Sequence, residues 1–307
     1  MDVLGLGGKV AVVTGGGGNI GSATVSMLAQ VGAHVLVVDS DGAAAEAAAR
    51  LAQDQGADAL AVPCDVRRID EIERMVETAL DRWDRLDVGV NIVGGGAGMG
   101  KSTLELSDEE WEDSVETNLY TAVRCSRRFA RAMLGRDLAG SIVNIASPAG
   151  LRAAPAMVAY GASKAALINF TWTLAVELAP YGIRVNVVVP AFVPGPGMSW
   201  GGTEEEQAAL ARRTVPMGRV TRAEDVAGAI VAFRFQPDQL LDGTAHRVRR
   251  RPAADQSHQY RLGPRPPTLK RPLEDPLRAP AAAVQVGARA VRCRLRLRAQ
   301  SVSPLRL

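Results

Sequence analysis

The sequence predicts an α/β fold in three layers, with helices covering both faces of one parallel, doubly wound sheet. Short runs of β-branched residues alternate with stretches of helical periodicity along most of the chain. Such apolar runs are typical of strands buried on both faces, as parallel sheets require. The length of 307 residues is sufficient for one large domain of this kind.

The first expected strand, 9–14, leads into a glycine-rich turn and then a helix over 22–31. In such a unit, backbone N–H groups and the helix N-terminus face an anion, and glycine allows a pyrophosphate to approach closely. The unit therefore predicts a Rossmann-like dinucleotide site at this turn. The residues expected to line it are Gly15, Asn19, Ile20 and Gly21.

The second expected strand, 34–39, ends in the acid Asp39. An acid at this position is placed to bind the ribose hydroxyls of NAD, and its charge would repel the 2′-phosphate of NADP. Neither Ser40 nor Asp41 supplies a positive charge to offset it. The sequence therefore favours NAD as cofactor over NADP.

The remaining segments continue the alternation. Expected strands cover 59–66, 86–93, 142–147 and 183–190, and expected helices cover 43–55, 69–82, 107–133, 160–180 and 225–233. Ser107 and Glu110 form a capping box at the start of the third of these helices. Residues 191–202, rich in Pro and Gly after a strand end, are a candidate substrate lid.

Three side chains are expected to carry chemistry. Ser147 ends a buried strand, and Tyr160 and Lys164 lie one helical turn apart at the start of the next helix. A lysine ammonium beside a phenol favours the phenolate, so we expect Lys164 to lower the pKa of Tyr160. The serine hydroxyl could then hold a carbonyl against that phenol.

In their order and spacing, these motifs resemble the short-chain dehydrogenase/reductase family over roughly residues 7–232. The matching residues are Thr14-Gly15-x-x-x-Asn19-x-Gly21 for the glycine motif TGxxxGxG, Asp39 for the NAD-selecting acid, Asp65-Val66 for the adenine pocket, Asn91-Ile92-Val93-Gly94 for NNAG, and Asn118, Ser147, Tyr160 and Lys164 for the catalytic tetrad. The departures are Asn19 for a glycine, Ile92 and Val93 within NNAG, and Ala191 for the glycine after Pro190. Because Asn tolerates left-handed backbone better than other non-glycine residues, we expect the turn to survive at Asn19.

The resemblance implies an NAD-dependent oxidoreductase that interconverts a secondary alcohol and a ketone, with a small molecule as its substrate. Tyr160 would be the general acid and base, Lys164 would lower its pKa and bind the nicotinamide ribose, and Ser147 would bind the substrate oxygen. Asn118 would hold a water that links Lys164 to solvent. Further expected cofactor contacts are Asp65, Val66, Asn91, Gly94, Pro190 and Val193.

The last quarter of the chain differs from the rest. Residues 233–307 contain 16 Lys and Arg, 5 Asp and Glu, and nine of the 17 prolines, without helical periodicity. We therefore divide the chain into a dinucleotide-binding domain, 1–233, and a basic, disordered tail, 234–307. Family members continue with a seventh strand here. Its absence suggests a frameshift near residue 233, since plausible codons read one base later restore a similar ending.

Two other functions are also consistent with the sequence. A scrambled C-terminus could leave a dinucleotide-binding protein with impaired catalysis, or the basic tail could be an interaction arm. We expect neither nucleic acid nor membrane as a partner, and we expect a homo-oligomer if the C-terminus were intact. Three scattered cysteines and three histidines predict no metal site, and the lack of a signal or spanning segment favours the cytoplasm.

Overall fold

The computed structural model describes residues 5–96, 98–194, 203–215 and 217–233. Within these ranges, six strands form one parallel sheet in the order β3-β2-β1-β4-β5-β6. The strands are β1 (Val10–Thr14), β2 (His34–Asp39), β3 (Ala59–Pro63), β4 (Val88–Asn91), β5 (Ser141–Ile145) and β6 (Arg184–Val188). The sheet is doubly wound and its order reverses between β1 and β4, which confirms the predicted fold class.

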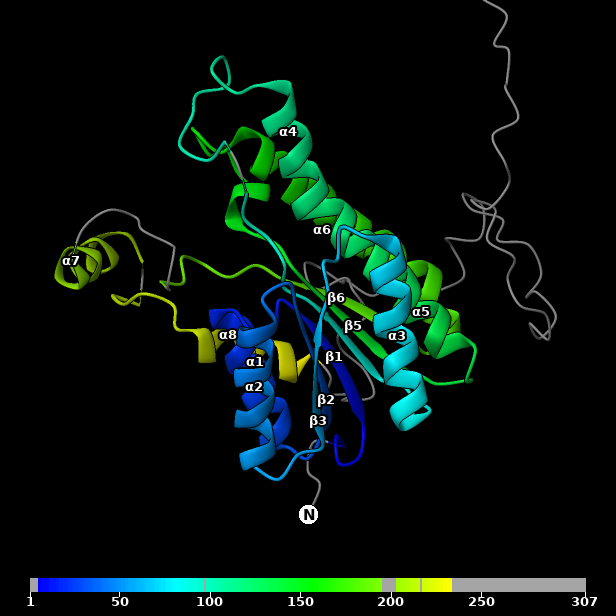
Figure 1. Cartoon of the computed structure of the whole chain (residues 1–307). Coiled ribbons are helices and arrows are strands. Elements are labelled where there is room, and N and C mark those ends of the chain that lie inside the picture. The colour runs from blue at the N-terminus through cyan, green and yellow to red at the C-terminus, as the bar shows by residue number, and fades with distance from the viewer. Residues whose placement is uncertain (1–4, 97, 195–202, 216, 234–307) are drawn as a thin grey trace, which may run out of the picture. The chain divides into compact units, whose positions relative to one another are not determined.

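Helices cover both faces of the sheet. The helical elements are α1 (Asn19–Gln30), α2 (Gly42–Asp54), α3 (Ile69–Trp83), α4 (Asp108–Val115), the π-helix η1 (Glu116–Tyr120), α5 (Thr121–Leu134), the short η2 (Pro148–Gly150), α6 (Val158–Leu178), the short η3 (Ala179–Tyr181), α7 (Glu204–Thr214) and α8 (Ala223–Ala232). Figure 1 shows α1, α2 and α8 on one face and α3, α5 and α6 on the other. The loop before α4 rises above the end of the sheet.

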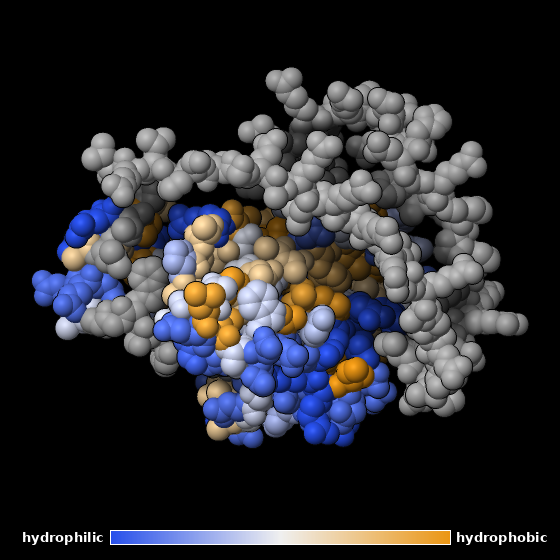
Figure 2. Space-filling model, turned by 90° about the horizontal axis from the view of Figure 1, so that it is seen from above, coloured by the Kyte–Doolittle hydropathy of each residue, from blue (hydrophilic) through white to orange (hydrophobic). Residues whose placement is uncertain are grey.

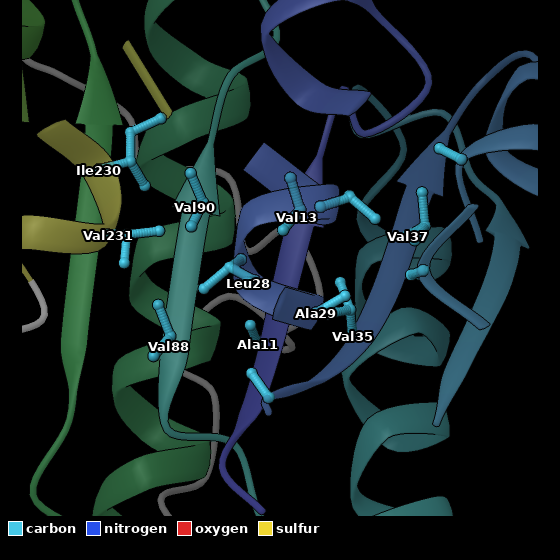
Figure 3. Packing of buried hydrophobic residues seen from close by; sticks show 14 of the residues in the cluster. Ala11, Val13, Leu28, Ala29, Val35, Val37, Val88, Val90, Ile230 and Val231 are labelled. Carbon is cyan, nitrogen blue, oxygen red and sulfur yellow. The ribbon is translucent and has the colours of Figure 1, made fainter. Parts of the chain in front are cut away.

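Alternation along the strands gives each face its own apolar core. On one face, Val13 and Val90 pack with Leu28 of α1 and Ile230 of α8 (Figure 3). On the other face, Val12 packs into the cluster that α3, α5 and α6 complete. All five residues of β1 are buried, as expected for a central strand with helices on both sides.

Several element boundaries differ from the sequence prediction. The helix expected over 107–133 is interrupted by the π-turn of η1, and α1 begins at Asn19 rather than at Ser22. The helix α7 was not predicted. Apart from β2, which matches its expected bounds, the described strands are shorter than their apolar runs because pairing ends before the chain leaves the sheet.

Two predictions fall outside the described residues. These are the tail over 234–307, with its missing seventh strand and frameshift, and most of the candidate lid, from 195 to 202. Among the helices that the structure describes, none combines the length and the apolar character needed to cross a membrane.

A buried carboxylate joins the amino ends of β1 and β4. Asp87 is fully buried, and it accepts hydrogen bonds from Val10 N at 3.0 Å and from Arg85 Nε at 2.8 Å. Lys9 Nζ lies 3.2 Å from its Oδ1. Burial acts to raise the pKa of Asp87, but the hydrogen bonds and the two cations outweigh it, so that this pKa lies below its ordinary value.

We expect Asp87→Asn to lower the free energy of unfolding by about 2 kcal/mol at pH 7, because a charged acceptor is lost. A carboxyl whose folded pKa is lowered stabilises the protein above its unfolded pKa, and this stabilisation is lost as the pH falls through the folded pKa. The difference between wild type and variant should therefore shrink below pH 3.8 in urea titrations. Asp84→Asn, at an exposed carboxylate, is the control. Equal stability of wild type and Asp87→Asn at pH 7 would contradict the assignment.

Candidate active site

In the glycine turn after β1, backbone segments approach so closely that there is no space for side chains at key positions. Gly15 has φ +71°, and a Cβ added to Gly21 would lie 1.9 Å from the Gly15 carbonyl oxygen. The N-cap of α1 is Gly18, which supplies no side-chain cap, and the first turn of the helix carries no acid. The backbone N–H groups at this helix start are therefore available to an anion.

We expected the glycine turn to survive at Asn19 because Asn tolerates left-handed backbone, but the turn does not place Asn19 in that conformation. The described non-glycine residues with positive φ are Asp84, Asp137 and Ala156, and Asn19 is the first residue of α1. Its replacement of glycine therefore needs no unusual backbone. Its side-chain amide instead donates to the carbonyl oxygen of Pro194 at 2.6 Å.

Asp39 lies at the end of β2, beside the glycine turn. Its Oδ2 accepts from Gly17 N at 3.0 Å and its Oδ1 accepts from Asp41 N at 3.1 Å, so two backbone donors orient the carboxylate. Beyond the end of β3, Asp65 accepts from Arg67 N at 3.0 Å and Val66 is buried. The expected adenosine-binding residues thus stand at the carboxyl ends of adjacent strands.

Lys164 on α6 is a buried cation. It is 2 % exposed, and its Nζ donates to the Ile145 carbonyl oxygen at the end of β5, at 2.9 Å. A Cβ added to Gly94 would lie 2.9 Å from this Nζ and 3.1 Å from Asn118 Oδ1. A larger residue in place of Gly94 would therefore clash with the side chains of Lys164 and Asn118.

Asn118 occupies the centre of the π-turn. Its Oδ1 accepts from Gly95 N at 2.9 Å, and its Nδ2 donates to Gly95 O at 2.6 Å and to Ser114 O at 2.9 Å. π-turns often occur at functional sites. Here the turn directs the Asn118 side chain towards the backbone of Gly95, in the segment that follows β4. The water between Asn118 and Lys164 that the resemblance implies stays a prediction.

Ser147 and Tyr160 meet at the end of β5. Ser147 precedes η2, its Oγ accepts from Ala149 N at 3.3 Å, and its side chain hydrogen-bonds to Tyr160. A Cβ on Gly150 would lie 2.7 Å from Ala165 N, so η2 packs directly on the backbone of α6. This close packing, which the sequence did not reveal, brings the serine to the tyrosine.

The pKa values differ from the expectation. Burial raises the pKa of Tyr160, and the hydrogen bond with Ser147 only partly opposes this. Lys164 Nζ lies 5.7 Å from the centroid of the tyrosine ring and is directed at a carbonyl, and burial lowers its own pKa to about 8. The expected lowering of the Tyr160 pKa is therefore wrong for this arrangement, because burial of the phenol outweighs the opposing hydrogen bond with Ser147.

The side chain of Asn91, at the end of β4, is buried on the face of the sheet that α5 and α6 cover. Its Nδ2 donates to Ser126 Oγ at 2.9 Å and to Asn144 Oδ1 at 2.8 Å. Asn144 in turn donates to Thr171 Oγ1 at 2.9 Å, which links β4, β5, α5 and α6. The signal for Asn144 in the sequence was a polar residue inside a buried apolar strand.

The segment after β6 completes the edge of the sheet. Pro190 is partly exposed, and Val193 is buried in the core cluster on the α1 side. Together with the uncapped start of α1 and the oriented Asp39, these residues fit a dinucleotide laid across the carboxyl edge of the sheet. This arrangement defines the class of protein as a dinucleotide-binding oxidoreductase.

Comparison with known proteins identifies the family. A family model described as short chain dehydrogenase matches residues 9–207. The chain is 35% identical over 232 residues to a 3-oxoacyl-[acyl-carrier-protein] reductase from Synechocystis sp., covering 75% of this chain and 90% of that protein. The protein belongs to the short-chain dehydrogenase/reductase family, a family of oxidoreductases.

Two solved structures are similar over most of their length. NAD+-bound xylitol dehydrogenase has a TM-score of 0.69 at 30% identity, covering 76% of this chain and 94% of that chain. A singly substituted actinorhodin polyketide ketoreductase with NADPH has a TM-score of 0.69 at 34% identity, covering 75% of this chain and 91% of that chain. The two neighbours therefore share the fold and differ in the dinucleotide that they hold.

We expect Gly150→Ala to reduce turnover at least tenfold and to lower the free energy of unfolding by about 1–3 kcal/mol, because the added Cβ meets backbone atoms of α6. Gly228→Ala is the matched control, since a Cβ there meets nothing within 4 Å and α8 gains a better helix former. Steady-state kinetics and urea unfolding measure both effects. A Gly150→Ala variant as active as Gly228→Ala would contradict the close packing of η2 on α6.

Proposed function

We propose that this protein is an NAD-dependent oxidoreductase that interconverts a secondary alcohol and a ketone by hydride transfer. The observation that carries the proposal is the hydrogen bond between Ser147 and Tyr160, with the buried Lys164 ammonium 5.7 Å from the tyrosine ring. A hydroxyl, a phenol and a cation at the ends of adjacent elements can bind a carbonyl oxygen and exchange a proton with it. The proposed catalytic residues are thus Ser147, Tyr160, Lys164 and Asn118.

The role that we propose for each catalytic residue follows from where its side chain lies in the site. When bound, the reduced dinucleotide would supply a hydride for reduction of the ketone, and the oxidised form would accept a hydride from the alcohol. Ser147 orients the substrate oxygen towards the Tyr160 hydroxyl, which donates a proton to it in reduction and accepts one in oxidation. Lys164 stabilises the phenolate electrostatically. Asn118 binds the backbone of Gly95 and so fixes the neighbouring Gly94, whose missing side chain leaves room for the lysine.

The pKa of Tyr160 affects which direction of the reaction is favoured at neutral pH. Because burial raises this pKa, the phenol stays protonated at neutral pH and is ready to donate. Reduction should therefore proceed at neutral pH, whereas oxidation needs the phenolate and should become faster as the pH rises. The curated relative from Synechocystis is named as a reductase, which agrees with this direction.

The preference for NAD rests on the residues of this chain, since one solved relative holds NAD+ and another NADPH. Asp39 presents a fixed carboxylate where a 2′-phosphate would approach, and Asp41 adds a second negative charge two residues on. At short range, two carboxylates would repel the phosphate. Both residues therefore support NAD.

Apolar side chains around the carboxyl edge support an apolar carbonyl substrate. Leu151 is 61% exposed after η2, and Leu104 is 97% exposed on the loop before α4. The two loops are joined by a hydrogen bond from Gly100 N to Ala156 O at 2.8 Å. Figure 2 views this end of the molecule and shows apolar surface among polar surface. We propose a ketone with an extended apolar substituent, the class to which the 3-oxoacyl substrates named for the relative belong.

We also propose that the protein forms homo-oligomers. Trp172 and Val176 lie one turn apart on α6 and are 46% and 61% exposed, which is unusual for large apolar side chains on one helix face. Static light scattering of the purified chain tests this, and a monomeric mass at micromolar concentration would contradict it.

We expect Tyr160→Phe to lower kcat about 10²- to 10⁴-fold, because the general acid is lost while the ring is retained. Apolar and cyclic ketones with NADH provide the assay, and NADH binding followed by fluorescence should change little. Undiminished turnover in this variant would remove Tyr160 from the reaction. If wild type binds NADH but turns over no ketone in the panel, the protein is a dinucleotide-binding module instead.

We expect wild type to prefer NAD, and Asp39→Ser to shift the ratio of kcat/KM for NAD over NADP by at least about tenfold towards NADP, roughly 1.4 kcal/mol of electrostatic repulsion removed. Asp41→Asn is the control, because Asn can still cap α2. It should move the ratio less. A wild-type enzyme that uses NADP as well as NAD would show that Asp39 does not select the cofactor.

A further inference from the structure

Asn19 joins two parts of the site that are far apart in the sequence. Its Nδ2 donates to Pro194 O at 2.6 Å, across a separation of 175 residues. Asn19 is the first residue of α1, at the glycine turn, and Pro194 follows β6. A glycine at position 19, which the family motif calls for, would have no side chain to make this bond.

The order of the sheet shows what the bond connects. Asp39 ends β2 and Asp65 follows β3, on one side of the switch point, whereas Ser147 follows β5, which pairs with β6 on the other side. A dinucleotide oriented by Asp39 therefore has its adenosine half over the first side and its redox half over the second. Asn19 lies at the turn between them and reaches to the redox side.

Pro194 is also held through its neighbour. Val193 is 6% exposed and packs in the same cluster as Val13 and Val90, near the ends of β1 and β4. The buried valine and the Asn19 bond give this short segment two adjacent attachments. One is apolar and lies below the edge, and the other is polar and lies at the glycine turn.

We propose that Asn19 is a positioning residue that fixes the Val193–Pro194 backbone against the glycine turn, and so favours binding of the whole dinucleotide over its adenosine half. This inference rests on the proposed function, because it assigns Val193 to the redox end of the cofactor. Asn19 acts through Pro194 and need not touch the reacting atoms.

Comparing a whole dinucleotide with half of one tests this role. Dissociation constants for NADH and for ADP would be measured by titration with wild type, Asn19→Ala and Asn19→Gly. ADP reaches the glycine turn and lacks the nicotinamide riboside. Both variants should bind NADH about 3- to 10-fold more weakly and ADP within about twofold of wild type, the size expected for one hydrogen bond. Gln30→Gly, at the exposed end of the same helix, should leave both constants unchanged.

Equal weakening of NADH and ADP in both Asn19 variants would overturn the proposal, because it would place Asn19 in the turn itself or on the phosphates. Unchanged NADH binding would overturn it too, since the bond to Pro194 would then contribute nothing to affinity. A different failure is recognisable in wild type: if it binds neither NADH nor ADP, the proposed dinucleotide function is wrong and this inference falls with it.

Discussion

The burial of the Lys164 ammonium is the constraint on which the rest of the site depends. A cation removed from water needs a polar partner and space, and each is supplied by a different part of the fold. Ile145 at the end of β5 provides the carbonyl, and Gly94 after β4 provides the space. Gly150 lets the turn after Ser147 lie on the backbone of α6 next to the lysine. The site can therefore form only when the two successive β/α units that begin with β4 and β5 are correctly paired.

The buried lysine that serves the proposed reaction also lowers the stability of the fold. Burial lowers the pKa of Lys164 to about 8 from the ordinary 10.5, so the charged form destabilises the fold most below pH 8. That cost decreases as the pH rises above 8 and is absent only well above 10.5, where the lysine would be neutral in either state. An apolar residue in its place would avoid the cost and would leave the Tyr160 phenolate without a cation. The protein keeps a charge where packing alone would favour none.

Local patterns predicted much of the fold, since strand and helix periodicity, the glycine turn and the capping box at Ser107 depend on neighbours in sequence. The sequence did not reveal features set by distant contacts. The π-turn places Asn118 against Gly95, 23 residues away, and nothing within 107–133 marks that break. The core amides of Asn91 and Asn144, 53 residues apart, meet because β4 and β5 pair. The glycine motif draws attention to the backbone of Asn19, whereas the structure shows that its side chain donates to the Pro194 carbonyl oxygen.

Titration of the Lys164 ammonium tests its burial most directly, because it needs neither substrate nor cofactor. Its 15Nζ signal can be followed by NMR and assigned by its absence in Lys164→Arg. Burial of the ammonium predicts a midpoint near pH 8, well below the ordinary lysine value of 10.5. A midpoint at 10.5 or above would show that the ammonium is hydrated, and would contradict its burial beside Ile145 and Gly94.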